Sequence, residues 1–130
     1  MALTKPSFSM IGVDAQENVY LGQDALATGT GAYNIAIGTD ALSKNTTGDY
    51  GTAVGRWALK NNTEGQQNTG IGVDAMWGNT TGDFNVAIGT HAMVYSDTGN
   101  YNVAVGLNAL NDNTTASYNT AVGYNSLALN

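Results

Sequence analysis

Apolar residues recur along this chain with a period longer than that of any single helix or strand. Glycine preceded by Ile, Val or Leu appears after a first spacing of 16 and then at five consecutive spacings of 17, at Gly22, Gly38, Gly55, Gly72, Gly89, Gly106 and Gly123. One unit reads G-x-[DN]-A-[LM]-x-x-N-T-T-G-D-Y-N-x-A-[IV], as in residues 38–54. Residues 11–15 resemble residues 71–75, so the pattern reaches almost to the N-terminus. Self-similarity at a fixed period indicates a repeat architecture.

Each unit contains two clusters of Gly, Asn, Asp and Thr, separated by short runs such as YNIAIG and TDAL. Seventeen residues are too few for a helix-turn-helix unit, and two short strands with two turns fit the pattern best. The sequence therefore predicts an all-β fold, a parallel β-solenoid of about seven coils over residues 10–130. Apolar residues do not recur every six positions, which excludes the hexapeptide-repeat acyltransferases.

Two apolar columns run through the repeat, and each has a small neighbour beside it. One column follows the Ala of the YNIAIG run and comprises Ile37, Val54, Ile71, Ile88, Val105 and Val122. The other follows the Ala of the TDAL run and comprises Leu42, Leu59, Met76, Met93, Leu110 and Leu127. Adjacent strand residues face opposite sides, so continuous apolar runs indicate burial on both faces. A thin solenoid has one interior, so we predict an obligate homo-oligomer, with either column able to face the interior.

Charge and composition exclude several function classes. The chain has four basic residues against ten acidic ones and a net charge of -6, which does not suit a nucleic-acid partner. It has no cysteine and one histidine, so we expect neither a thiolate zinc site nor a cofactor. No run of 18 apolar residues and no secretory signal is found, so we expect no membrane insertion.

The third position of the repeat carries the residues that come closest to site chemistry, namely Asp24, Asp40, Trp57, Asp74, His91, Asn108 and Asn125. Stacked carboxylates could hold a cation. Asp and Asn are also common turn residues that accept hydrogen bonds from nearby backbone N–H groups, and no calcium-loop motif is present, so we predict no metal site. No serine or cysteine accompanies His91 in a pattern that would pair a nucleophile with a base, so we predict that the protein is not an enzyme.

Aromatic residues fall into two groups. Tyr33, Tyr50, Phe84, Tyr101 and Tyr118 share one repeat position, and we expect them to stack from coil to coil as part of the framework. A second group breaks the repeat at positions where other coils carry small or polar residues, and comprises Trp57, Trp77, Tyr95 and Tyr124. Exposed rings can pack against the C–H face of a sugar, with Arg56 and His91 as hydrogen-bonding partners. Scattered surface aromatics are also ordinary, so a glycan site stays a hypothesis beside that interpretation.

The tandem motif N-x-A-[IV]-G-x-[DN]-A-[LM], with its N-T-T-G-[DS]-Y-N turn, resembles the YadA-like head repeats of trimeric autotransporter adhesins and related repeats of bacteriophage tail fibres. The resemblance covers residues 11–130, and the 17-residue period is similar to the longer, phage-associated form. It implies a left-handed parallel β-roll and a homotrimer. A fold of this kind can carry many binding sites, so the resemblance specifies fold more closely than function.

The ends of the chain bear on its setting. No export signal, heptad stalk or membrane anchor is recognised, which favours a virion protein made in the host cytoplasm over the head of a bacterial adhesin. The opening MALTKPSFSMI is similar to the start of some phage tail-fibre chains, so residues 1–9 and the adjoining Met10 form either an attachment segment, with Lys5, Pro6 and Phe8, or a frayed terminus.

Two functions remain open at this point. The first is a trimeric tail fibre or spike that attaches to a host surface glycan or protein. The second is a purely structural virion component, as a capsid or tail decoration or as a spacer between an adaptor and another fibre protein. The chain stops about half a coil after Gly123 without a polar cap. This apolar end could be covered by a second protein, which favours the spacer, or could close on itself at the threefold axis.

Overall fold

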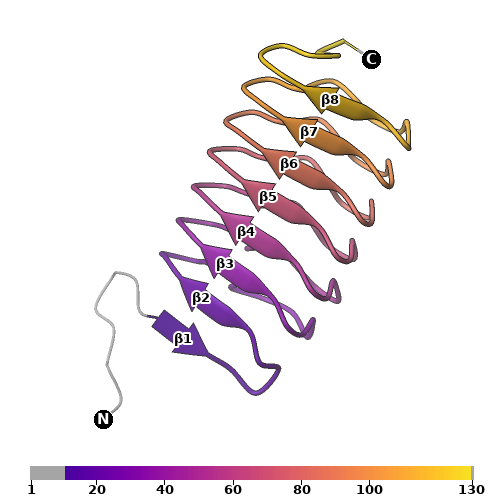
Figure 1. Ribbon diagram of the computed structural model, residues 1–130. Helices are drawn as coiled ribbons and strands as arrows, with labels where there is room; N and C mark the ends of the chain where they lie inside the picture. The colour runs from indigo at the N-terminus through magenta and orange to yellow at the C-terminus, as the bar shows by residue number, and fades with distance from the viewer. Residues whose placement is uncertain (1–10, 130) are drawn as a thin grey trace.

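The computed structural model describes residues 11–129, which form a rod of stacked coils with one short strand in each (Figure 1). The strands are β1 (Ile11–Val13), β2 (Val19–Leu21), β3 (Ile35–Ile37), β4 (Thr52–Val54), β5 (Thr69–Ile71), β6 (Val86–Ile88), β7 (Val103–Val105) and β8 (Thr120–Val122). They form a single sheet in chain order, and from β2 onward every pair is parallel. The predicted all-β parallel solenoid with 17-residue coils is confirmed. Lys5, Pro6, Phe8 and Met10 lie outside the described residues.

The solenoid has about six turns, fewer than the seven expected, because the first strand does not belong to a coil. β1 pairs antiparallel with β2, with Ile11 opposite Leu21, so residues 11–21 form a hairpin. Asp14 closes it by accepting hydrogen bonds from the N–H of Gln16 and of Asn18, each at 3.0 Å. Burial alone would raise the pKa of Asp14, but hydrogen bonds from Asn18 and Gln16 hold it below its ordinary value of 3.8.

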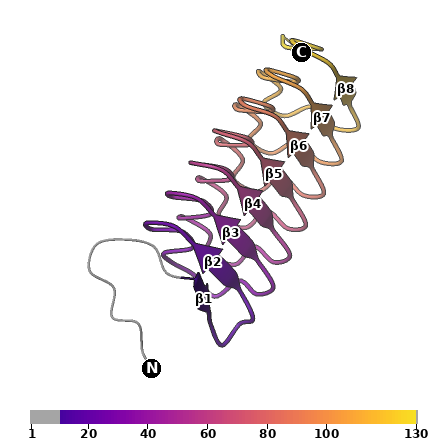
Figure 2. The ribbon, with the colours of Figure 1, turned by 60° about the vertical axis from the view of Figure 1, so that its left-hand side comes forward.

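Each coil has one strand rather than the predicted two, and the TDAL run is a turn. The sheet lies along one side of the rod, and the turns and loops complete each coil behind it (Figure 2). In the run at residues 39–42, Asp40 and Leu42 have φ of 57° and 50°, which is left-handed backbone that no strand contains. The run still stacks on its neighbours, since the N–H of Leu42 donates to the Ala58 carbonyl at 3.1 Å.

This left-handed backbone decides which columns form the core. Ala41 and Leu42 are adjacent, yet both are fully buried, because the alternation of strand side chains does not apply to a turn. The expectation that adjacent residues of this run face opposite sides of a strand was therefore wrong. In the strands alternation holds, with Ala36 buried and Ile37 facing outward. The core thus comprises Ala columns together with Leu42, Leu59, Met76, Met93 and Leu110, whereas Leu127 in the last coil is exposed.

Two columns of buried asparagine join the coils inside the rod. In the first, the Oδ1 of Asn85 accepts the N–H of Asn102 at 2.9 Å, and the Nδ2 of Asn85 donates to the Gly99 carbonyl at 2.8 Å. In the second, the Nδ2 of Asn62 donates to the Oδ1 of Asn45 at 2.9 Å. These side chains supply partners for backbone groups that the short strands leave unpaired, so the coil depends on them as much as on its apolar core.

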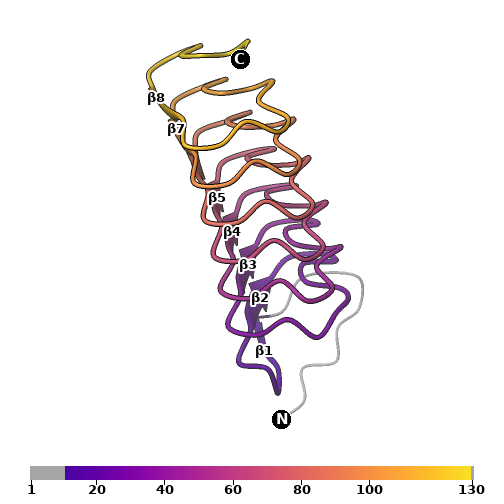
Figure 3. The same cartoon turned by 90° about the vertical axis from the view of Figure 1, so that its right-hand side faces the viewer.

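The glycine that ends each strand explains why the repeat requires it. Gly38 has φ of 132°, and a Cβ added there would lie 2.5 Å from the carbonyl oxygen of Gly55 in the next coil. Any side chain at this position would push neighbouring coils apart, so the stacking of coils itself selects glycine. The coils seen from the side stack as nearly identical loops (Figure 3).

Candidate functional site

A cleft of about 380 Å³ lies on the wall of the rod formed by the residues that follow each strand. Its lining residues come from successive coils and from three columns of the repeat, the columns of Asp40, Ser43 and Lys44. They are Trp57, Lys60, Asp74, Trp77, His91, Val94, Tyr95 and Asn111. The volume falls in the range of about 300–1,000 Å³ that is typical of small-molecule sites.

Trp57 forms one end of the cleft and is firmly held. Its indole Nε1 donates to the Oδ2 of Asp40 at 3.1 Å, and the same oxygen pairs with the Nζ of Lys60 at 3.0 Å. The Arg56 guanidinium lies 4.2 Å from the centre of the ring, and the Lys60 ammonium lies 5.1 Å from it. Both distances allow a cation–π interaction, so Trp57 is fixed by three contacts, one with each of three neighbours.

Trp77 and Tyr95 contribute aromatic rings that make no hydrogen bond and no ring stacking contact within the described part of the chain. The indole N–H of Trp77 and the hydroxyl of Tyr95 have no hydrogen-bond partner among residues 11–129, and neither ring stacks on another there. Tyr95 is 53% exposed. In the coil below, its column is occupied by Gly78, where a Cβ would lie 2.7 Å from the Val94 carbonyl oxygen. The two coils stack too closely at this position to admit a side chain at Gly78.

The polar floor of the cleft includes a histidine–carboxylate pair. The Nε2 of His91 lies 3.3 Å from the Oδ2 of Asp74, whose other carboxylate oxygen is buried and has no partner among the described residues. Asn111 donates from Nδ2 to the His91 carbonyl oxygen at 3.1 Å. This pair lies beside aromatic rings and an amide side chain in the lining of the cleft.

The structure brings together five of the six residues that the sequence singled out. Trp57, Trp77, Tyr95 and His91 line the cleft, and Arg56 lies over the Trp57 ring. Tyr124 is 72% exposed in the last coil and does not line it. Sequence reasoning missed four further lining residues, Lys60, Asp74, Val94 and Asn111. The 17-residue spacing could have found three of them, because Lys60, Val94 and Asn111 share one column with Trp77. Asp74 lies in the column of Trp57 and His91.

The Asp and Asn residues of the third repeat position do not behave as predicted. The sequence suggested that their side chains accept hydrogen bonds from backbone N–H groups, but Asp40 and Asp74 instead contact side chains of the next coil. The backbone explains why Asp and Asn are frequent at this position. Every member of the column has φ between 52° and 62°, a region that Asp and Asn tolerate better than most residues.

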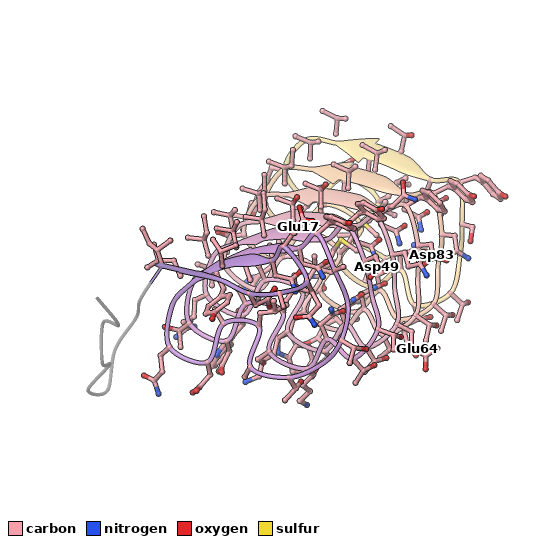
Figure 4. The ribbon with its side chains drawn as sticks, turned by 90° about the horizontal axis from the view of Figure 1, so that it is seen from below. Glu17, Asp49, Glu64 and Asp83 are labelled. Carbon is pink, nitrogen blue, oxygen red and sulfur yellow. The ribbon has the colours of Figure 1, made fainter. Side chains whose placement is uncertain are left out.

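The remaining carboxylates are dispersed. Asp49, Glu64 and Asp83 lie at the turns on one side of the rod (Figure 4). The Oδ1 of Asp49 accepts the N–H of Ala32, and that of Asp83 accepts the N–H of Gln66, both at 2.7 Å. Within residues 11–129, no three His, Cys, Asp or Glu side chains gather closely enough to hold a metal ion.

The outward face of the sheet is a second notable surface of the molecule. It carries three parallel columns of six residues each over β3–β8 and the positions just before these strands, and none of these residues is charged. The outer column is the one that begins at Ile37, the middle column runs from Ile35 to Thr120, and the third is the aromatic column from Tyr33 to Tyr118. Ile35 and Ile88 are each 40% exposed. Side chains project from this face in the view along the rod (Figure 4).

The aromatic column stacks as predicted. The rings of Phe84 and Tyr101 lie 4.9 Å apart at an interplanar angle of 2°, and those of Tyr101 and Tyr118 lie 5.3 Å apart. Tyr33 and Tyr50 stack at 5.1 Å, and Gln67 separates the two groups. The rings stack face to face along the rod but remain partly exposed, so they belong to the uncovered face.

Comparisons with protein families, with curated proteins and with solved structures find no match to this chain. Within the described residues, no helix has the length and apolar character needed to cross a bilayer.

Proposed function

We propose that this protein is a non-enzymatic bacteriophage virion component, a homotrimeric fibre or spike of left-handed β-rolls that attaches the particle to its host. The observation that carries the proposal is the uncharged, partly apolar outer face of the sheet. The resemblance of the 17-residue repeat to phage-associated adhesin repeats supports the viral setting, the handedness and the threefold symmetry.

The outer face would be more stable buried against other copies of this chain than exposed to water. Burying a branched apolar side chain completely is worth about 1.5–3 kcal/mol, and the Ile37 column is only partly covered within one chain. A contiguous apolar patch of this kind is a common mark of an interface. Identical rods have identical faces, and closed rotational symmetry covers all of them without leaving a free copy of the patch.

Packing through the sheet leaves the cleft wall available for attachment. Residues 39–44 and their equivalents follow the strand and turn away from the sheet, so the wall containing Trp77 and Tyr95 is a different side of the coil. A fibre built in this way would carry three copies of the cleft along its sides. Repeated sites raise overall avidity without requiring tight binding at any one of them.

The test combines mass and attachment. Light scattering of the purified chain should give three times 13.4 kDa, and the labelled trimer should bind saturably to a bacterial strain that the parent virus infects. A stable monomer would contradict the burial argument. A trimer that binds no host strain would contradict the attachment role and favour the alternative, a purely structural virion component. Detection of the chain in a bacterial outer membrane fraction would contradict the viral setting.

A further inference from the structure

We propose that the cleft on the rod wall is a saccharide-binding site, in which Trp77 and Tyr95 stack on a sugar ring and the neighbouring polar groups bind its hydroxyls. The inference deepens the proposed attachment role by naming the class of ligand, and it rests on that role only for its biological meaning. The site itself is argued from the cleft.

Two aromatic rings of the cleft, Trp77 and Tyr95, are available to a ligand. A sugar ring has a face of C–H groups, and this face packs favourably on the π-face of an aromatic side chain, which also excludes water at little entropic cost. Trp57 is already engaged by Asp40, Arg56 and Lys60, so it acts as a fixed end wall. Trp77 and Tyr95 have no comparable contacts within residues 11–129 and are free to receive a ligand.

Polar groups surround those rings in the arrangement that hydroxyl recognition needs. The indole N–H of Trp77 and the hydroxyl of Tyr95 are unpaired among the described residues, Asn111 uses only its Nδ2, and Lys60 can donate beyond its contact with Asp40. A purely apolar ligand would leave these groups without partners, which is costly in a cleft. A ligand with a C–H face and a rim of hydroxyls satisfies both halves of the lining.

The charges at the cleft indicate which classes of sugar it could bind. The protein is acidic, at -6, yet the cations at the cleft, Arg56 and Lys60, are two of only four basic residues in the chain. The Asp40 carboxylate pairs with the Lys60 ammonium, which offsets its charge, and the Asp74 carboxylate lies against Nε2 of His91. Arg56 has no carboxylate partner in the described part of the chain. The cleft therefore accepts a neutral sugar and also offers a guanidinium to an acidic one.

The experiment uses the fact that the chain has two tryptophans, both of which line the cleft. Tryptophan fluorescence of the assembled protein, excited selectively so that the seven tyrosines do not contribute, therefore reports on this site alone. One arm titrates neutral probes, namely glucose, galactose, mannose and N-acetylglucosamine and short oligosaccharides of each. The other titrates acidic probes, namely glucuronic acid, N-acetylneuraminic acid and oligosaccharides that contain them. All are taken to tens of millimolar.

The expected result is a saturable fluorescence change with at least one probe. Trp77→Ala and Tyr95→Ala should each weaken its binding at least about tenfold, measured by calorimetry for the variants, and Tyr95→Phe should keep most of the affinity if stacking dominates. The matched control is Tyr124→Ala, which removes an exposed tyrosine outside the cleft and should leave the affinity unchanged. Because Tyr95 is half exposed, its substitution tests the site even if Trp77→Ala fails to fold.

The outcomes separate this proposal from the proposed function. Absence of a saturable change with every probe overturns the saccharide site, and so does binding that Trp77→Ala and Tyr95→Ala leave intact or that Tyr124→Ala abolishes equally. A trimer that attaches to host cells yet ignores all probes refutes the saccharide site while leaving the attachment role standing. Saccharide binding by a chain that proves monomeric supports the site and contradicts the trimeric fibre.

Discussion

The indole nitrogen of Trp57 donates a hydrogen bond to the carboxylate of Asp40, which occupies the same repeat position one coil below. The distance is 3.1 Å, and the accepting oxygen also pairs with Lys60. Trp57, which interrupts the column of Asp and Asn residues, is thus held in place by a hydrogen bond to a member of that column. The Asp40 carboxylate therefore contributes both to the stacking of the coils and to the wall of the candidate site, so substitutions at Asp40 should affect stability and the site.

Asp40→Ala should lower the free energy of unfolding by about 1–3 kcal/mol, because it removes the acceptor of Trp57 and the partner of Lys60 and places alanine at φ of 57°. Chemical denaturation measures the change, and tryptophan fluorescence should shift as Trp57 loses its hydrogen bond. Asp40→Asn is the control, since its amide oxygen can still accept from Trp57 and asparagine tolerates this backbone. Equal destabilisation by both variants would contradict this account.

Ile88→Asp combined with Val105→Asp should abolish trimer formation, because it places carboxylates in adjacent coils of the outer face that we propose is buried between chains. Light scattering would then report a 13.4 kDa monomer or aggregation. The control is Thr98→Glu with Thr115→Glu, which adds the same charge at the exposed turn position that Glu64 occupies in its own coil. Soluble, well-folded trimers from the Asp variant would show that this face is not the interface.

Ser96→Asn should stabilise the protein by about 1–2 kcal/mol. Ser96 interrupts the second asparagine column, and both its Oγ and the Oδ1 of Asn79 are buried without a partner among the described residues. One and two coils below, the same position is filled by Asn79 and Asn62, whose amide joins the coil beneath at 2.7 Å and 2.9 Å. Differential scanning calorimetry should show a higher Tm. Ser96→Ala, which leaves the Oδ1 of Asn79 without a donor, should not raise the Tm comparably.

Leu59→Ala should cost about 2–5 kcal/mol, because Leu59 is fully buried between the Ala columns and its removal leaves a cavity that the stacked coils cannot close. Urea denaturation measures the loss. Leu107→Ala removes the same side chain from a residue that is 43% exposed, so its effect should stay below about 1 kcal/mol. Comparable losses at both positions would contradict the assignment of the Leu column to the interior.

The candidate site could be predicted in part because the repeat makes exceptions visible. Trp57, Trp77 and Tyr95 stand out against the small or polar residues of other coils. Tyr124 stands out equally, yet it does not line the cleft. The sequence shows which repeat position a residue occupies, but it does not show where the surface of the rod is hollowed. Lys60 and Asn111 escaped notice because charged and amide side chains look ordinary on a polar wall until they line a hollow.

The sequence by itself determined the coil length, the parallel stacking and the strand at each N-x-A-[IV] run, because a fixed 17-residue period admits no other way of bringing like residues together. Only the tertiary structure decided that β1 turns back as a hairpin and that Leu42 is inside while Ile37 is outside. Leu42 lies inside because the backbone is left-handed at three non-glycine positions of each regular coil, which are the positions of Asp40, Leu42 and Tyr50. For Leu and Tyr such φ values cost about 1–2 kcal/mol each, and packing against the next coil, not local preference, makes them favourable.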